Sequence, residues 1–268
     1  MTDAAAPGII PALANTGSIR AVIFDYGNTL IPFGRAEVDS FDSRLAAYLR
    51  SRFGPFDAIR YHEVREQDRL APYQGSPPAY RESDLYPMVG RLFAVLFGGP
   101  PGPEILREII EIRREIFADI VVMAPETRDL LQKLRGRFRL GLLSNYPDGE
   151  AIRRSLARNR ADTLFDAVVV SGDLGLVKPH PEVFRAITRA LDVPPHQCLF
   201  VGDNWLADVQ GARRAGMTTL HVVRWIPPEC FDPMPDDLLP HAEISDLSCL
   251  LTMLPEHPLV AGDPACHG

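Results

Sequence analysis

Six polar residues follow short apolar runs of the sequence, and their side chains are of the kinds that phosphate chemistry uses. They comprise three carboxylates, one ammonium, one hydroxyl and one amide: Asp25, Ser144, Asn145, Lys178, Asp203 and Asp208. Carboxylate oxygens favour a hard cation such as Mg²⁺, which shares its coordination shell with substrate phosphate. If these side chains meet in the fold, the sequence predicts a site for a phosphate group and a metal ion.

Five runs rich in Val, Ile and Leu predict the sheet that would bring these residues together. The runs cover 21–25, 140–144, 167–171, 198–202 and 218–223. Near-continuous apolar runs are typical of strands buried on both faces of a parallel sheet. Amphipathic helical patterns separate the later runs, at 126–136, 149–159, 181–192 and 205–215. Repeated βα units of this kind predict a Rossmann-like parallel α/β sheet, which binds ligands at the carboxyl ends of its strands.

A long interval without strands separates the first run from the second. It contains helical patterns near 36–53, 57–70, 81–97 and 103–120, divided by Pro/Gly clusters at 75–78 and 98–103. The last pattern is the clearest, since isoleucines recur from Ile105 to Ile120 at spacings of three and four. We therefore predict an all-α insertion over 34–120, packed over the carboxyl edge of the sheet.

The remaining chain divides around that insertion. Residues 19–33 and 121–255 are predicted to form one α/β core domain. Residues 1–18 and 256–268 are rich in small residues, proline and glycine, and are predicted to be flexible.

Composition excludes several classes of protein. Hydrophobic residues make up 46% of the 268 residues and the net charge is −7, without a dense basic tract. This argues against nucleic-acid binding. No run of 18 apolar residues predicts a membrane span, and the first residues do not resemble a secretory signal. The four cysteines form no CxxC pair, so we expect free thiols and a cytoplasmic protein. The sequence does not decide between a monomer and a homodimer.

Lysine is scarce in this chain. Only Lys133 and Lys178 are lysines among 28 basic residues. A lysine that persists where arginine is the usual choice has a raised chance of being required, which favours a function for Lys178.

The order of the polar motifs resembles the four signature motifs of the haloacid dehalogenase superfamily. They are Asp25 in FDYGNTL, Ser144 in LLSNYPDG, the Lys-Pro pair in GLVKPHPEVF, and Gly-Asp-x-x-x-x-Asp in VGDNWLAD. Each motif is modest alone, and their order at successive strand ends is specific. The resemblance covers about 19–33 and 121–255, and the helical interval stands where that family carries its C1 cap.

This resemblance implies a phosphohydrolase, or alternatively a phosphotransferase, acting on a small phosphorylated metabolite. Asp25 would be the nucleophile that becomes an aspartyl-phosphate. Ser144 and Asn145 would bind substrate, with the Ser144 hydroxyl on a phosphoryl oxygen. Lys178 would neutralise charge on both the nucleophile and the phosphate.

The resemblance also implies a bound Mg²⁺. The Asp25 and Asp203 carboxylates and the Gly27 backbone carbonyl would be its protein ligands. Asp208 would support the water shell of the metal or orient Lys178, and would count among the catalytic residues. Taken singly, Asp25 also fits a helix cap, Asp208 fits an ordinary exposed aspartate on a helix, and Ser144 with Asn145 fits a turn.

The sequence departs from the family at Gly27, where phosphatases usually place a second aspartate as general acid and base. Two alternatives to a phosphatase therefore stay open. One is a catalytically weak protein that binds a phosphorylated ligand or a protein partner. The other is a 2-haloacid dehalogenase, although those members work without Mg²⁺ and carry an aromatic residue at the position of Gly27. Tyr61, His62 and Arg65, in the helical interval, are candidates for contact with the substrate. Asn204 fits either a residue that supports the site or a helix cap.

Overall fold

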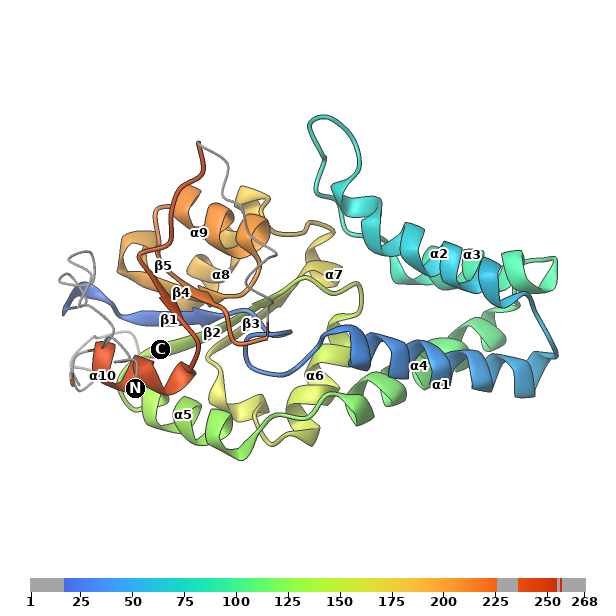
Figure 1. Ribbon diagram of the computed structural model, residues 1–268, viewed down its shortest axis with the longest axis horizontal. Coiled ribbons are helices and arrows are strands. Elements are labelled where there is room, and N and C mark those ends of the chain that lie inside the picture. The colour runs from blue at the N-terminus through green and yellow to red at the C-terminus, as the bar shows by residue number, and fades with distance from the viewer. Residues whose placement is uncertain (1–16, 226–235, 255, 257–268) are drawn as a thin grey trace, which may run out of the picture.

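A six-stranded, fully parallel sheet runs through one half of the molecule in the computed structural model, which describes residues 17–225, 236–254 and 256 (Figure 1). Its strand order is β3-β2-β1-β4-β5-β6. The strands are β1 (Ala21–Phe24), β2 (Arg139–Ser144), β3 (Ala167–Val170), β4 (Cys198–Gly202), β5 (Thr218–Val222) and β6 (Ala242–Ile244). Strand β1 lies between β2 and β4, with Ala21 opposite Arg139 on one side and Cys198 on the other. The predicted Rossmann-like α/β fold is confirmed.

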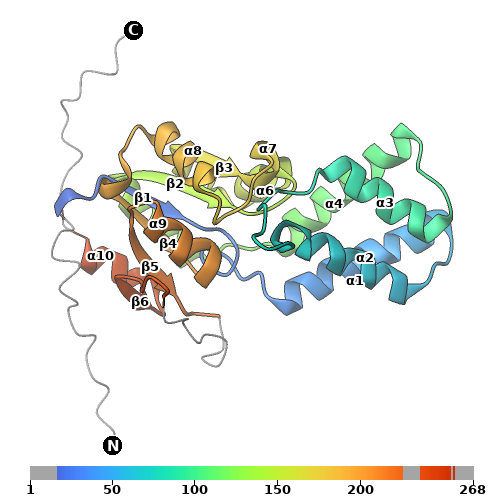
Figure 2. The same ribbon diagram turned by 90° about the horizontal axis from the view of Figure 1, so that it is seen from above.

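Helices cover both faces of the sheet, which explains why its inner strands β1 and β4 are buried along their whole length (Figures 1 and 2). One face carries α8 (Pro181–Leu191) and α9 (Gly211–Arg214), and the other carries α5 (Pro125–Arg135), α6 (Gly149–Arg158) and α10 (Leu250–Met253). Alternate residues of β1 belong to two separate cores: Val22 and Phe24 to one, Ala21 and Ile23 to the other. This alternation follows from the two-residue period of a strand.

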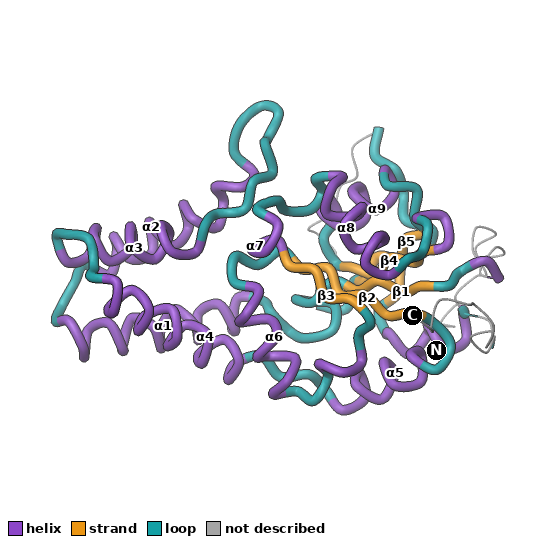
Figure 3. Tube along the Cα trace, turned by 180° about the vertical axis from the view of Figure 1, so that it is seen from behind, coloured by secondary structure: helices purple, strands orange, loops and turns teal. Residues whose placement is uncertain are grey.

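Four long helices form the inserted helical segment, residues 34–120, which lies beside the sheet at one end of the molecule (Figure 3). They are α1 (Arg35–Phe53), α2 (Ala58–Leu70), α3 (Leu85–Phe97) and α4 (Pro103–Ile120). Helix α1 packs on α4 and α2 packs on α3. Helix α2 begins where Asp57 accepts hydrogen bonds from the next backbone N–H groups, and α4 begins with a proline in its first turn.

Short helical turns complete the described chain. They are α7 (Ser171–Leu174), the π-helical turn η5 (Trp205–Gln210), and the 3₁₀ turns η2 (Ala71–Tyr73), η3 (Asp162–Leu164), η4 (Pro195–Gln197) and η7 (Leu247–Cys249).

Within the described residues, the inserted helical segment contacts the part of the chain that forms the sheet in two places. Helix α4 packs against α6, where Arg114 Nε lies 2.8 Å from a carboxylate oxygen of Asp148. The loop between α2 and α3 also contacts the core, because the backbone N–H of Val177 donates to the Tyr80 carbonyl at 2.9 Å. Both attachments lie close to the carboxyl ends of the strands.

Some details differ from the sequence prediction. Strand β6 was not predicted, and α3 begins at Leu85 rather than 81, because Asp84 caps it. The predicted helix 205–215 starts as the wider turn η5 before continuing as α9. Residues 1–16 and 257–268, where flexible ends were predicted, lie outside the described residues, as do Cys230 and Cys266. Cys198 and Cys249 are free thiols. Among the described helices, none has the length and apolar character needed to cross a bilayer.

Candidate active site

Asp25 stands at the carboxyl end of the central strand β1. Its backbone N–H donates to the Val201 carbonyl at 2.9 Å, which continues the ladder between β1 and β4 by one residue. The residue is 8% exposed. The central position places this carboxylate beside the ends of both neighbouring strands, where Ser144 ends β2 and Gly202 ends β4.

Lys178 lies in the loop between α7 and α8 and extends its side chain to Asp25. Its Nζ donates to Asp25 Oδ1 at 2.6 Å, Asp208 Oδ1 at 2.7 Å and the Leu143 carbonyl at 2.9 Å. All three N–H groups of the ammonium are thus used within the protein. Burial alone would lower the pKa of Lys178, but the carboxylates of Asp208 and Asp25 outweigh it and raise that pKa. The side chain therefore stays charged.

Asn145 holds the backbone of Lys178. Its Oδ1 accepts from the Lys178 N–H at 2.8 Å, and its Nδ2 donates to the Lys178 carbonyl at 3.1 Å and to the Tyr73 hydroxyl at 3.0 Å. Both N–H groups of the amide are occupied in this way. The side chain predicted to bind substrate is thus committed to positioning Lys178.

Asp208 projects from the π-helical turn η5 toward Lys178. Its second oxygen, Oδ2, accepts from the backbone N–H of Asn204 at 2.9 Å, so both oxygens are held. A Cβ on Gly202 would overlap the Asp208 carboxyl group, so glycine is required there. Asn204 itself caps η5, since its side chain accepts from the Ala207 N–H at 2.8 Å. This geometry favours the second of the two predicted roles for Asp208, the orientation of Lys178.

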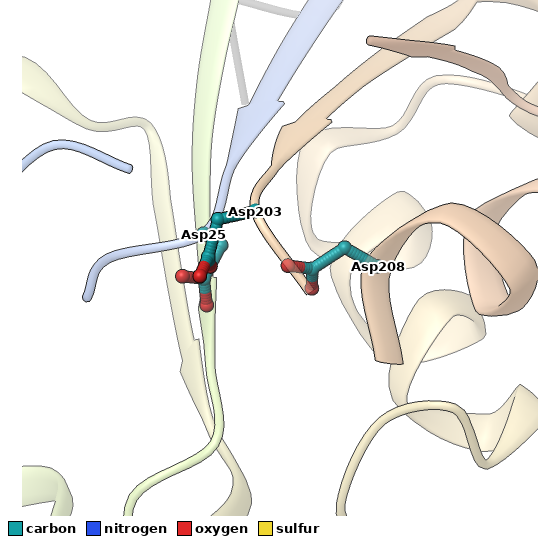
Figure 4. Close-up of side chains that lie close together, drawn as sticks. All are labelled: Asp25, Asp203 and Asp208. Carbon is teal, nitrogen blue, oxygen red and sulfur yellow. The ribbon is translucent and has the colours of Figure 1, made fainter. Parts of the chain in front are cut away.

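Three carboxylates converge at the sheet edge: Asp25, Asp203 and Asp208 (Figure 4). One carboxylate oxygen from each lies within 4.8 Å of the others. Burial raises the pKa of Asp25 to about 6, against the opposing effect of Lys178. Burial, Asp25 and Asp208 raise the pKa of Asp203 to about 8. One ammonium balances only part of this negative charge, so the cluster fits a divalent cation with oxygen ligands.

A cavity of about 940 Å³ opens above this cluster, between the sheet edge and the inserted helical segment. Ser144 and Gly27 line its floor, together with the carboxylates and Lys178. Of the helical residues noted in the sequence, His62 and Arg65 line the cavity. Tyr61 is not among the lining residues, because its buried hydroxyl donates to Asp42 Oδ1 at 3.0 Å.

Gly27 lies in the cavity wall with Phe33 behind it. A Cβ at this position would lie 3.2 Å from Phe33 Cβ, which is a tight contact. No positive φ is required there. The position usually held by a second aspartate therefore carries no acid, and admits one only if Phe33 shifts slightly.

Sequence reasoning did not identify His221 as part of the site. It is buried in β5, where its Nε2 lies 2.9 Å from the Asp203 backbone carbonyl and its Nδ1 lies 3.0 Å from Glu243. With Nε2 protonated, the ring donates to that carbonyl and fixes the backbone of Asp203. The available signal was a histidine within the apolar run TTLHVV.

The sequence pattern of the haloacid dehalogenase-like hydrolases matches residues 19–216. A glyceraldehyde 3-phosphate phosphatase of Methanopyrus kandleri is 28% identical over 242 residues, which cover 89% of this chain and 98% of that protein. The human N-acylneuraminate-9-phosphatase is 29% identical over 254 residues, 88% of this chain and 94% of its own length. The crystal structure of a 2-haloacid dehalogenase from Pseudomonas syringae pv. Tomato DC3000 matches with a TM-score of 0.66 at 24% identity, over 88% of this chain and 97% of that one. At that identity the likeness shows the shared fold.

Proposed function

The chain belongs to the haloacid dehalogenase-like hydrolase family, and from that premise we propose that it is a Mg²⁺-dependent phosphohydrolase for a small phosphorylated metabolite. One observation carries this proposal: Asp25, Asp203 and Asp208 meet around the buried Lys178 at the carboxyl edge of the sheet. The names of the two relatives, both phosphatases that match most of this chain, support it.

The first step is attack by Asp25 on the phosphorus atom of a phosphate ester. Lys178 holds Asp25 Oδ1 and so fixes the orientation of the carboxylate. A bond forms between an Asp25 oxygen and phosphorus, and the bond between phosphorus and the leaving oxygen breaks. With no acid at Gly27, the leaving oxygen departs as an anion and takes a proton from water. Lys178 and the hydroxyl of Ser144 would stabilise the charge on the phosphoryl oxygens. In the second step water attacks the aspartyl-phosphate, which releases phosphate and restores Asp25.

The residues present fit Mg²⁺, because the excess negative charge of the cluster is borne by carboxylate oxygens. The Asp25 and Asp203 carboxylates and the Gly27 backbone carbonyl would hold the ion. When bound, Mg²⁺ supplies positive charge that neutralises the carboxylates and the phosphate. Asp208 acts through Lys178, whose ammonium it holds against Asp25.

We further propose that residues 34–120 act as a cap domain over a core formed by 19–33 and 121–255. The cavity between the two parts is lined by both. Closure over a small substrate would exclude bulk water and strengthen the electrostatic interactions inside.

A dehalogenase activity is less compatible with this site. The 2-haloacid dehalogenases of this family work without a divalent cation. The cluster here has three carboxylates and one ammonium, that of Lys178, so it favours a bound cation. Gly27 also leaves the position of their aromatic residue without a side chain.

The proposal is tested by a panel of sugar phosphates, nucleotides, acyl phosphates and phosphonates, assayed with Mg²⁺ and with excess EDTA. We expect phosphate release that requires Mg²⁺ and a protein mass increase of one phosphoryl group after acid quenching. L-2-chloropropionate is assayed in parallel. Chloride release in the presence of EDTA, without any phosphate release from the panel, would replace the proposal with a dehalogenase.

A further inference from the structure

Arg113 is a buried cation without a hydrogen-bond partner among the described residues. It projects from the middle of α4 and is only 5% exposed, yet it lines the cavity above the carboxylate cluster. Its Nη1 is fully buried and makes no hydrogen bond. The guanidinium lies 5.3 Å from the ring centre of Phe41, and this cation–π contact offsets part of the cost of burying its charge. An unpaired buried charge is costly, so its presence beside a cavity requires an explanation.

The carboxylates around Arg113 already have arginine partners of their own. Asp42 lies 2.9 Å from Arg65 Nε, and Asp68 pairs with Arg91. Burial and the neighbouring Arg65 lower the pKa of Arg113. Arginine nevertheless remains protonated in proteins. Arg113 is therefore the surplus positive charge on this wall of the cavity.

The wall that carries Arg113 continues to the phosphate end of the cavity. Phe117, one turn further along α4, lies 4.5 Å from Tyr146 between ring centres, and Tyr146 follows Ser144 and Asn145. Tyr146 and Phe117 also line the cavity. A substrate whose phosphate rests beside Ser144 and Lys178 would thus extend along this wall toward Arg113.

We propose that Arg113 binds a second anionic group of the substrate, a carboxylate or a second phosphate, remote from the ester bond that is cleaved. This inference rests on the proposed phosphohydrolase function and narrows its substrate class to phosphate monoesters that carry another anion. The guanidinium offers a planar array of donors that matches either group. Arg65, held by Asp42, adds positive charge on the same side. The substrate anion then supplies the partner that Arg113 lacks within the protein.

Matched probes test the inference. 3-Phosphoglycerate and glycerol 3-phosphate differ by a carboxylate in place of a hydroxymethyl group. Glucose 1,6-bisphosphate and glucose 6-phosphate differ by the second phosphate. In at least one pair, we expect the wild-type protein to prefer the member that carries the second anionic group. The identity of that pair shows whether Arg113 binds a carboxylate or a phosphate. Arg113→Met should reduce the preference, measured as the ratio of kcat/KM within the pair, by roughly 10- to 100-fold. Arg113→Lys should restore part of it.

Arg107→Met is the control, because Arg107 is exposed on the same helix and does not line the cavity. It should keep the wild-type ratio. The melting temperature gives a second readout, since removal of an unpaired buried charge should not destabilise the protein. A lowered melting temperature with an unchanged ratio would mean that Arg113 pairs with Asp68, whose Oδ2 is also without a partner, and would overturn the proposal.

Binding separates the failure of this inference from failure of the proposed function. Calorimetric titration of the same probes into the wild-type and Arg113→Met proteins reports affinity without turnover. Affinity that depends on Arg113 and on the second anion, without hydrolysis, would support the subsite and refute the phosphohydrolase. Hydrolysis without any preference for the second anion would refute the subsite and leave the phosphohydrolase intact.

Discussion

Replacement of Lys178 by methionine should destabilise the protein strongly and in a pH-dependent manner. The methionine nearly preserves the volume of the side chain but removes the ammonium that Asp25 and Asp208 share. The side chains of Lys178 and Asp208 are 2% and 1% exposed, so solvent cannot replace the lost charge. Breaking a buried ion pair by removing one partner costs about 3–5 kcal/mol. For a protein of this size that corresponds to a drop in melting temperature of roughly 6–20 °C.

The pH dependence of this destabilisation follows from the direction in which the pKa of Asp25 is shifted. Burial already raises the pKa of Asp25 to about 6 while Lys178 opposes the shift, so loss of Lys178 raises it further. A carboxyl group whose pKa is higher in the folded state than in the unfolded state favours folding at low pH, and this contribution is lost as pH rises through the folded value. The loss in free energy of unfolding caused by Lys178→Met should therefore be small near pH 5 and large near pH 8.

Urea denaturation in EDTA at both pH values measures this penalty. Lys133→Met is the matched control, because the only other lysine of the chain is exposed on α5 and should lose less than about 0.5 kcal/mol. A loss below about 1 kcal/mol for Lys178→Met at pH 8, or a larger loss at pH 5 than at pH 8, would refute the description of Lys178 as the charge that compensates the cluster.

Four further predictions concern chemistry and metal binding. Asp25→Asn should abolish phosphate release while circular dichroism shows an intact fold, and retention of more than a few per cent of activity would exclude Asp25 as the nucleophile. Asp203→Ala should raise the Mg²⁺ concentration needed for half-maximal activity, with partial recovery at high Mg²⁺; an unchanged requirement would place the ion elsewhere. Because Asp203 has its pKa raised to about 8 and must lose a proton to bind the ion, Mg²⁺ affinity should rise up to about tenfold per pH unit from pH 6 to 8, and a flat profile by calorimetry would contradict this. Without an acid at Gly27, aryl and acyl phosphates should react faster than alkyl phosphates; Gly27→Asp, for which Phe33 must shift by a few tenths of an ångström, should speed alkyl phosphates more, and a rate independent of leaving-group pKa in the unmodified protein would refute the idea.

Sequence patterns predicted most of the core because its strands are buried on both faces. A run such as residues 198–202 has no competing interpretation once helical patterns flank it. Strand β6 was not predicted, because it is not buried on both faces. It has three residues, and its central residue, Glu243, is exposed at the sheet edge, so no apolar run marks it.

The candidate site was predictable only as far as residue order allowed. The motif order placed Asp25, Asp203 and Asp208 together with Lys178. In the structure Lys178 donates to Asp25 and Asp208, and a carboxylate oxygen of Asp203 lies within 4.8 Å of theirs. The commitment of Asn145 to the Lys178 backbone depends on a contact between two loops far apart in sequence, which no periodicity reports.

The sequence contains one signal for Arg113. It stands four residues after Ile109 and three before Ile116, on the apolar face of α4. A charged residue at that position breaks the helical pattern. The sequence alone does not indicate a role for Arg113, because the periodicity does not show that this face of the helix lines a cavity.

The central position of β1 has a consequence for biosynthesis. This strand is made first, yet its two neighbours are β2, starting at Arg139, and β4, starting at Cys198. The helices of residues 34–120 pack on one another within one continuous segment, α1 on α4 and α2 on α3, and can fold while the ribosome is still translating the rest. The strand that carries Asp25 has no partner until β2 emerges and stays open on one edge until β4 follows. A nascent chain that stalls before Gly202 would therefore expose an unpaired apolar strand edge, which is prone to aggregation.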